Sequence, residues 1–198
     1  MVSGLAACSL SGSGPGEANG SAGPLPDPVI STINATCTSP PSRDRAGATV
    51  TYAPQNLIDG SLDTAWRCGG DGSGQTVDVV LREPSTITTV GLVPGHAKTD
   101  AADGSDRYAQ NPKIAEVVWE FDGGRPVHQT FDGTSAGRRL QTMAIAPLAA
   151  QRIRITIVRS TMGQSVNGAP VDCTYDMQTS EVFACYINVS GGPSLYFT

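Results

Sequence analysis

Residues 56–66 read N-L-I-D-G-S-L-D-T-A-W and carry the strongest structural signal of the chain. An Asp-Gly pair after an apolar pair predicts a sharp reversal, because Gly60 has no Cβ to forbid a positive φ. Asp59 and Thr64 then place side-chain oxygens beside exposed carbonyls, the mixed oxygen shell that calcium prefers. Trp66 has two interpretations that the residues leave open, a core anchor or an aromatic surface for a sugar.

The composition favours a β-rich domain with many loops. The chain has 198 residues, among them 23 Gly and 14 Pro, and only 16% of them are charged. That length accommodates one domain with a substantial core, and this composition is typical of β proteins rather than helical ones. The net charge of -5 argues against nucleic acid as a partner, because such binding requires a basic stripe.

Short alternating or β-branched runs, separated by turn signals, predict the strands. They cover residues 76–81, 86–93, 114–121, 127–131, 140–145, 152–158 and 179–186. An Asp-Gly-Gly turn at residues 122–124 predicts a hairpin. In the run 152–158, Ile153, Ile155 and Ile157 alternate with residues typical of an exposed face, as in a half-buried strand. No segment shows a 3.6-residue period, so we expect an all-β sandwich or jelly roll of about eight antiparallel strands.

The N-terminal part predicts an anchor and a stalk. The motif L-A-A-C ending at Cys8 resembles a bacterial lipobox, so we interpret residues 1–8 as a truncated lipoprotein signal with Cys8 as the acylated residue; an accidental match is the alternative. Residues 9–31, rich in Ser, Gly and Pro, predict a flexible stalk. We expect a folded domain over residues 32–190 and a loose tail over 191–198. With no apolar run long enough to cross a membrane, contact with the membrane is expected only through the lipid anchor.

Four further cysteines predict two disulfides and an oxidising compartment. They are Cys37, Cys68, Cys173 and Cys185. None has the C-x-x-C spacing of a zinc site. Three pairings are possible, and we favour Cys37–Cys68 and Cys173–Cys185 because each pair brackets one local segment. Buried free thiols in a cytosolic protein are the alternative.

The order of these parts resembles the discoidin family, also called coagulation-factor type C. The resemblance rests on N-x-x-D-G-x-x-x-T-x-W at residues 56–66, on the apolar strand at 77–81 and on S-E-V at 180–182. Residues 90–111 look more specifically like the actinobacterial branch related to the glycan-binding translocation domain of streptococcal NAD-glycohydrolase. Covering residues 33–186, the resemblance implies a galactose-binding-like jelly-roll β-sandwich.

The resemblance also implies one structural calcium ion. The ligands that it carries over are Asp59, the backbone of Ser61, Thr64 and Glu181. Such an ion would fasten an early loop to the last strand. The alternative is that Asp59 caps its own turn and Glu181 faces solvent.

Ligands of the resembled family bind to loops at one end of the sandwich. The candidates here are Trp66, Arg67, His96, Arg107, Tyr108 and Asn111. Aromatic faces pack against the C–H surface of a sugar, and Arg or Asn binds its hydroxyl groups. The alternative is structural, with Trp66 in the core and Tyr108 fastening the loop to the sheet.

These expectations favour a non-catalytic glycan-binding module on a lipid-anchored, extracytoplasmic envelope protein. An envelope lipoprotein that docks a protein partner is the alternative. Catalysis is disfavoured, because there is no G-x-S-x-G elbow and the two histidines lie in separate segments. Of the carboxylates Glu120, Asp122 and Asp132, the two aspartates precede glycines, as turn residues do. A sugar site should show an aromatic beside Arg and Asn, and a docking surface a wide apolar patch.

Overall fold

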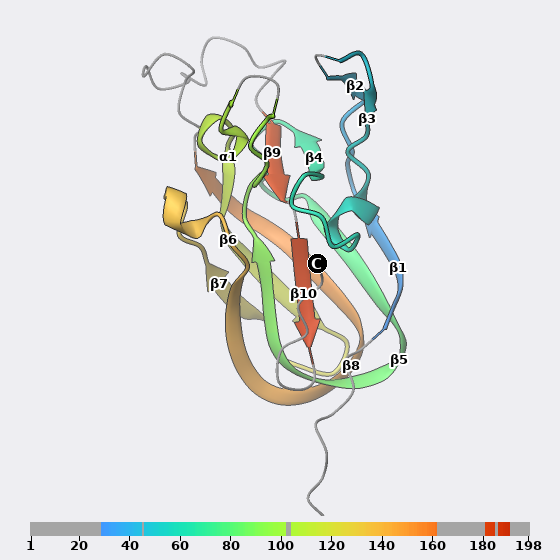
Figure 1. Ribbon diagram of the computed structural model, residues 1–198. Coiled ribbons are helices and arrows are strands. Elements are labelled where there is room, and N and C mark those ends of the chain that lie inside the picture. Colours follow the sequence, from blue (N-terminus) through green and yellow to red (C-terminus); the bar gives the residue numbers. More distant parts are fainter. Residues whose placement is uncertain (1–28, 45, 102–103, 162–180, 185, 191–198) are drawn as a thin grey trace, which may run out of the picture.

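The computed structural model describes residues 29–44, 46–101, 104–161, 181–184 and 186–190, which form a two-layer β-sandwich (Figure 1). The elements in chain order are β1 (Ile30–Ala35), β2 (Ser42–Arg43), β3 (Thr49–Val50), η1 (Pro54–Leu57), β4 (Trp66–Gly69), β5 (Thr76–Val93), α1 (Arg107–Gln110), β6 (Lys113–Phe121), β7 (Val127–Thr130), η2 (Ser135–Gly137), β8 (Gln141–Thr161), β9 (Glu181–Ala184) and β10 (Tyr186–Ser190). The all-β class predicted from the sequence is confirmed.

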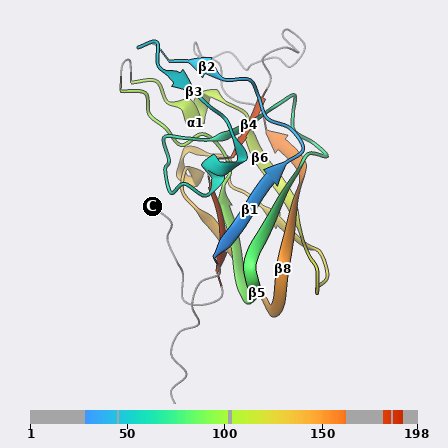
Figure 2. The same cartoon turned by 90° about the vertical axis from the view of Figure 1, so that its right-hand side faces the viewer.

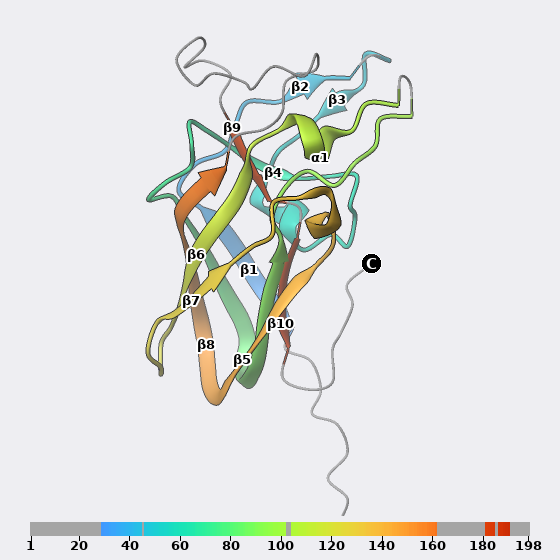
Figure 3. The same ribbon diagram turned by 90° about the vertical axis from the view of Figure 1, so that its left-hand side faces the viewer.

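Two long strands build most of the sandwich. The strand order is β1-β5-β8-β6-β9-β4, with β10 also paired to β5 and β7 to β6. Strand β5 pairs with β8 along most of its length, and both curve round one end of the molecule so that each contributes to both layers (Figures 1 and 3). The expected strands 76–81 and 86–93 are therefore one continuous strand, and so are 140–145 and 152–158.

Prolines mark the places where these long strands bend. The register of β5 shifts between Val80 and Ser85, around Pro84. A second shift places extra residues on β8, around Pro147. Proline has no N–H for the ladder and is tolerated at bulges, where the strand bends and its twist increases. Pro84 is also the turn signal that made the sequence predict separate strands at 76–81 and 86–93.

The main core lies between the two layers. Ile153, Ile155 and Ile157 of β8 point into it and are at most 3% exposed, while Arg152 and Arg154, which alternate with them, are exposed. The predicted alternation in this strand is confirmed. The hairpin predicted at 122–124 is also confirmed, because β6 pairs with β7 across that turn.

The short elements gather at the opposite end from the bends, which we call the loop end. The β2–β3 hairpin, β4 and α1 lie together there (Figure 2). Beneath them is a second, smaller apolar cluster of Tyr52, Ala65, Val93 and Ala97. The loop end thus has a small core of its own, on which surface residues can be positioned.

Several expectations about the chain's ends and cysteines can be compared with the structure. The disulfide Cys37–Cys68 is present, and the pair Cys173–Cys185, the anchor at Cys8 and the tail lie outside the described residues. Strand β1 begins at Ile30, inside the segment 9–31 expected to be a stalk. In the part of the chain that is described, no helix is long and apolar enough to cross a membrane.

Candidate ligand-binding site at the loop end

A polar cavity of about 320 Å³ opens at the loop end, and we call it the loop-end pocket. Its walls come from the β2–β3 hairpin, β4, the segment 96–100 and α1 with the residue that follows it. Four of the six predicted ligand residues line it: Arg67, His96, Arg107 and Asn111. Its volume is in the range of small-molecule sites. These four residues therefore converge on one cavity, although they come from three separate segments.

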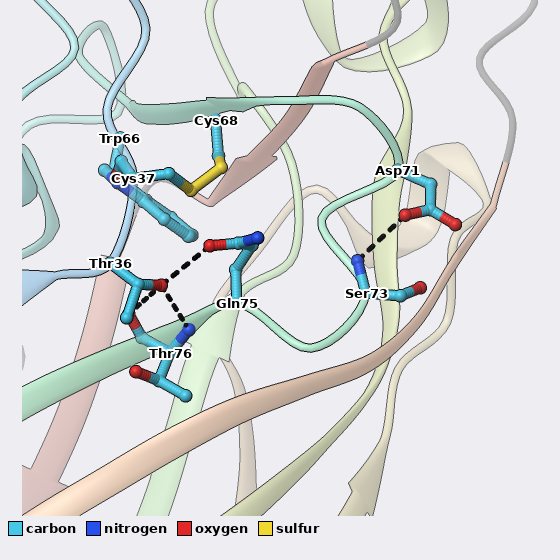
Figure 4. Close-up of a disulfide and its surroundings, with 8 residues drawn as sticks. All are labelled: Thr36, Cys37, Trp66, Cys68, Asp71, Ser73, Gln75 and Thr76. Atoms are coloured by element: carbon cyan, nitrogen blue, oxygen red, sulfur yellow. Dashed lines mark hydrogen bonds between the residues drawn. A yellow bond between two sulfur atoms is a disulfide. The ribbon is translucent and has the colours of Figure 1, made fainter.

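Strand β4 separates a core residue from a pocket residue. Successive side chains of a strand point to opposite faces. Trp66 is 1% exposed and its Nε1 donates to the carbonyl of Cys37 at 2.9 Å, next to the disulfide (Figure 4). Arg67 faces the other way and its guanidinium lies 4.9 Å from the centroid of the Tyr52 ring. Trp66 is thus a core anchor, and the stacking role expected for it is not available to a residue so deeply buried.

Tyr52 is the aromatic residue of the pocket, and the sequence analysis missed it. Its hydroxyl shares a 2.7 Å hydrogen bond with Oγ of Ser42, and the residue is 8% exposed. The ring stands beneath Arg67, an arrangement that fixes a flat guanidinium at the pocket wall. In the sequence Tyr52 follows a short β-branched run at residues 49–51, which predicts a strand but no binding role.

His96 is a neutral group in the pocket wall. It is 9% exposed, and Nε2 lies 3.2 Å from the carbonyl oxygen of Asp63. Burial lowers its pKa from 6.5, the Asp63 carbonyl opposes this, and the charges of Lys98 and Arg107 lower the pKa further. A carbonyl can only accept, so Nε2–H is the donor in this bond. His96 therefore holds the segment 96–100 against the loop of Asp63.

Ion pairs fix α1 at the pocket. Asp106 caps the helix by accepting from the backbone N–H of Ala109 at 3.0 Å, and it also pairs with Arg138. Arg107 pairs with Asp100 at 2.6 Å. Asn111 donates through Nδ2 to the carbonyl of Arg107 at 2.7 Å. These contacts hold Arg107 and Asn111 in place, and they engage both aspartates.

Tyr108 points away from the loop-end pocket. It is 1% exposed, donates to the carbonyl of Asp132 at 3.3 Å, and has the ammonium of Lys113 5.1 Å from its ring centroid. A Cβ on Gly95 would lie 3.0 Å from this ring, so the glycine makes room for it. Tyr108 lines a separate cavity of about 510 Å³. It fastens the loop to the sheet, and the ligand role expected for it is not supported.

Lys113 is buried by the packing around Tyr108. It is 5% exposed, and burial lowers its pKa. Its ammonium donates to the carbonyl of Asn111 at 3.1 Å. Lys113 therefore stabilises the backbone from which Asn111 reaches the pocket.

The expected calcium ligands come together only in part. Gly60 has the predicted positive φ of 76°. Asp59 accepts from the backbone N–H of Ser61 at 2.9 Å and from the Thr64 hydroxyl at 2.7 Å, so both carboxylate oxygens serve their own turn. Asn56 closes the loop by donating to the carbonyls of Thr51 and Ala65. Both carboxylate oxygens of Asp59 thus have hydrogen-bond partners within the turn, which agrees with the alternative that Asp59 caps its own turn.

The pairing of β9 with β4 places Glu181 away from the Asp59 turn. Strand β9 pairs with β4 so that Ala184 faces Trp66 and Glu181 faces Gly69. Glu181 thus lies three positions along the strand from Trp66, about 10 Å at the usual rise, on the side away from Thr64. Within the described ranges no three His, Cys, Asp or Glu side chains gather around a point where they could hold a metal ion. The register thus separates Glu181 from the Asp59 turn along β4.

The carboxylates considered for glycoside cleavage have structural partners. Asp122 accepts from the backbone N–H groups of Gln151 and Arg152 at 3.1 Å. Hydrogen bonds from the backbone and hydroxyl of Thr134 lower the pKa of Asp132, which keeps it ionised and unsuited to be a general acid. These interactions agree with the prediction that both aspartates are turn residues.

A third cavity, of about 410 Å³, lies on the outer face of the sheet over Asp78, Glu120 and Arg154. Arg154 binds Asp78 in a bidentate pair at 2.7 and 3.2 Å, and Glu120 accepts from Thr156. The cavity's one ion pair is thus internal to the sheet, and its aromatic residue, Phe121, is 8% exposed and faces the core. The loop-end pocket is the better candidate.

Comparisons with known proteins agree with this architecture. The family model described as NAD glycohydrolase translocation F5/8 type C domain matches residues 30–172. The CBM32-1 and CBM32-2 domains from Clostridium perfringens ZmpB, solved in complex with GalNAc, share 16% identity over 83% of this chain and 35% of that chain, with a TM-score of 0.53. The family 32 carbohydrate-binding module from C. perfringens NanJ in complex with galactose shares 19% identity over 80% and 92%, with a TM-score of 0.48. The likeness to the ZmpB domains, at a TM-score of 0.53, is one of fold alone. No curated protein sequence matches the chain.

Proposed function

Because the chain belongs to the NAD glycohydrolase translocation F5/8 type C domain family, we propose that it is a non-catalytic glycan-binding module whose ligand occupies the loop-end pocket. The observation that carries the proposal is the convergence of Arg67, His96, Arg107 and Asn111 on one cavity beside the ring of Tyr52. Planar Arg and Asn groups bind neighbouring hydroxyls of a sugar, and a nearby aromatic wall favours its C–H surface. A domain of similar fold solved in complex with GalNAc supports sugar as the class of ligand.

Binding in such a site needs little rearrangement. Arg67 is held over Tyr52, Arg107 is paired with Asp100, and Asn111 is tied to the backbone of α1. Groups that are already ordered lose little side-chain entropy when a ligand arrives. The site is shallow and polar, so we expect weak affinity per site, raised where several copies bind one multivalent glycan.

A glycan-array screen of the full chain tests this proposal. We expect binding by the wild type, loss of binding in Arg67→Gln and in Asn111→Ala, and retention in Arg125→Gln. Arg125 is an exposed cation in the β6–β7 turn, remote from the loop end (Figure 3). A folded wild-type protein that binds no glycan would overturn the proposal, and so would equal losses in all three variants.

No specific observation favours the protein-docking alternative. The large apolar side chains that the described residues expose are Val29, Leu62 and Val158. They lie before β1, in the loop after Asp59 and on β8, and so do not belong to one element. A docking surface needs a contiguous patch.

We also propose that the protein is extracytoplasmic and anchored through Cys8. The disulfide Cys37–Cys68 supports an oxidising compartment, and the lipobox-like motif supports the anchor. Metabolic labelling with an alkyne fatty acid in the producing cells tests it. Label on the wild type and none on Cys8→Ala is the expected result, and an unlabelled wild type would contradict the anchor.

Calcium binding is proposed for the Asp59 turn alone, since Glu181 lies elsewhere. An incoming ion would replace the hydrogen bond from Thr64 to Asp59 and add the Ser61 carbonyl, which is 3.4 Å from the Thr64 hydroxyl. Calcium should then raise the melting temperature of the wild type but not of Asp59→Asn. The same melting temperature in calcium and in chelator would exclude the ion.

A further inference from the structure

The loop-end pocket has a charge opposite to that of the chain. The whole chain has 18 acidic and 13 basic residues, for a net charge of -5. Four basic side chains line the pocket, Arg43, Arg67, Lys98 and Arg107. The acidic side chains that line it are Asp44, Asp63 and Asp100. A local excess of positive charge in a cleft attracts an anion more strongly than the same charges spread over a surface.

The acidic residues of the pocket are engaged or placed at its edge. Asp100 is bound by Arg107 at 2.6 Å. Asp44 accepts from the backbone N–H of Ala48 at 2.8 Å and closes its own hairpin turn. Asp63 is exposed, and its carbonyl is the group that accepts from His96. Hydrogen bonds do not remove the charges of Asp44 and Asp63, so the described residues that line the pocket carry an excess of one positive charge, four basic groups against three acidic ones.

Lys98 stands out among the basic residues. It is half-buried, and in the described part of the chain it forms no salt bridge. Its backbone is fixed, because its carbonyl accepts from the N–H of Arg107 at 3.1 Å. Burial lowers the pKa of its neighbour in the pocket, His96, and so disfavours a positive charge on that ring. Arg67 is held over Tyr52 with its planar fork at the wall, the geometry suited to an oxyanion.

We propose that the loop-end pocket selects sugars that carry a carboxylate or sulfate group over their neutral counterparts, and that Lys98 binds the anionic group. The inference rests on the proposed function, because it names the class of glycan that the same pocket takes. Arg67 supplies the second cationic contact, and Arg107 and Asn111 bind hydroxyl groups. The ammonium of Lys98 serves as a point charge, which accepts either anion without a strict geometry.

Matched sugar pairs test the inference. Affinities of the full chain are measured for the methyl glycosides of galactose, glucose and mannose and for the corresponding uronates, at low and high salt. We expect a uronate to bind about five-fold tighter than its neutral partner, the effect of one partly exposed charge pair. The preference should shrink in 0.5 M salt, where such pairs are screened. Galactose 6-sulfate in the same titration distinguishes a site for any oxyanion from one for carboxylates.

Lys98→Gln is the decisive variant and Arg125→Gln its control, since each removes one positive charge. Lys98→Gln should abolish the preference for uronates, whereas Arg125→Gln should keep it. Neutral sugars that bind as tightly as their uronates would overturn the inference and leave the glycan-binding proposal standing. So would a preference that survives Lys98→Gln. Failure of every sugar to bind would overturn both.

Discussion

The interior of the sandwich and its loop end are held together by different interactions. Between the layers, contiguous apolar side chains such as Trp66, Trp119 and Leu57 are at most 1% exposed. At the loop end a small apolar cluster supports a set of ion pairs and hydrogen bonds, among them Arg107 with Asp100 and Asp106 with Arg138. The comparison shows that one strand can contribute to both regions. Alternate side chains of β4 point into the core and into the loop-end pocket. Stability and binding should therefore respond to different substitutions, even at adjacent positions.

Replacing Trp66 should have the largest effect on stability. Trp66→Ala removes a fully buried indole and leaves the Cys37 carbonyl without its donor, which should lower the free energy of unfolding by about 3–5 kcal/mol. Urea denaturation followed by circular dichroism measures it. The milder Trp66→Phe should fold and still bind glycan. A folded Trp66→Phe that has lost glycan binding would show that Trp66 belongs to the site after all.

Removal of the disulfide should have the next largest effect on stability. The bond joins residues 31 apart in the sequence and ties the loop after β1 to β4. The double variant Cys37→Ser, Cys68→Ser should lose roughly 3–4 kcal/mol, because the unfolded chain regains the freedom of that loop. The control is the wild type under reducing conditions, which should match the double variant. Unchanged urea midpoints in both would contradict a structural role for this bond.

The variant Tyr108→Phe tests whether Tyr108 fastens the loop to the sheet or binds the glycan. Tyr108→Phe keeps the buried ring and removes the hydrogen bond to the Asp132 carbonyl, at a cost of about 1 kcal/mol. Glycan affinity should stay within two-fold, roughly, of the wild type. Titration calorimetry on both proteins decides the matter. A larger loss of affinity in a stable variant would return Tyr108 to the binding site.

The smallest expected effect is the pH dependence from His96. Burial lowers its folded pKa below 6.5, so below that pH the unfolded chain takes up a proton that the folded protein does not. Stability is therefore full above pH 6.5 and is lost as the pH falls through the folded pKa. We expect the free energy of unfolding to fall more between pH 7 and pH 5 in the wild type than in His96→Asn. His128→Asn, which changes an exposed histidine, should behave as the wild type, and identical slopes in all three would contradict the burial of His96.

The sequence predicted local periodicity well and long-range placement poorly. The strand faces around Ile153 and the hairpin after Phe121 follow from alternation and turn chemistry, which are local. The continuity of β5 and β8 was missed because Pro84 and Pro147 end a strand in one context and bend it in another. Only the surrounding fold decides whether a proline ends a strand or bends it.

At the candidate site, too, residues were predicted better by local pattern than by long-range placement. Arg67, His96, Arg107 and Asn111 were found by residue type, and the pocket confirms that they converge. Trp66 could have been placed in the core from the sequence alone: Cys68 lies two positions on, so the predicted disulfide put both residues on one face of the strand. Tyr52 gave no such signal, because its role depends on Ser42 and Arg67 folding around it. The position of Glu181 depends on a strand register that no local pattern fixes.

The most direct test of glycan binding in the loop-end pocket is an NMR titration of the isotopically labelled full chain with the sugar that binds best. We expect amide shifts at Arg67, in the segment 96–100 and in the segment 107–111, with the sheet face at Asp78 and Arg154 unaffected. Shifts confined to the sheet face, or none at saturating sugar, would contradict the assignment of the site.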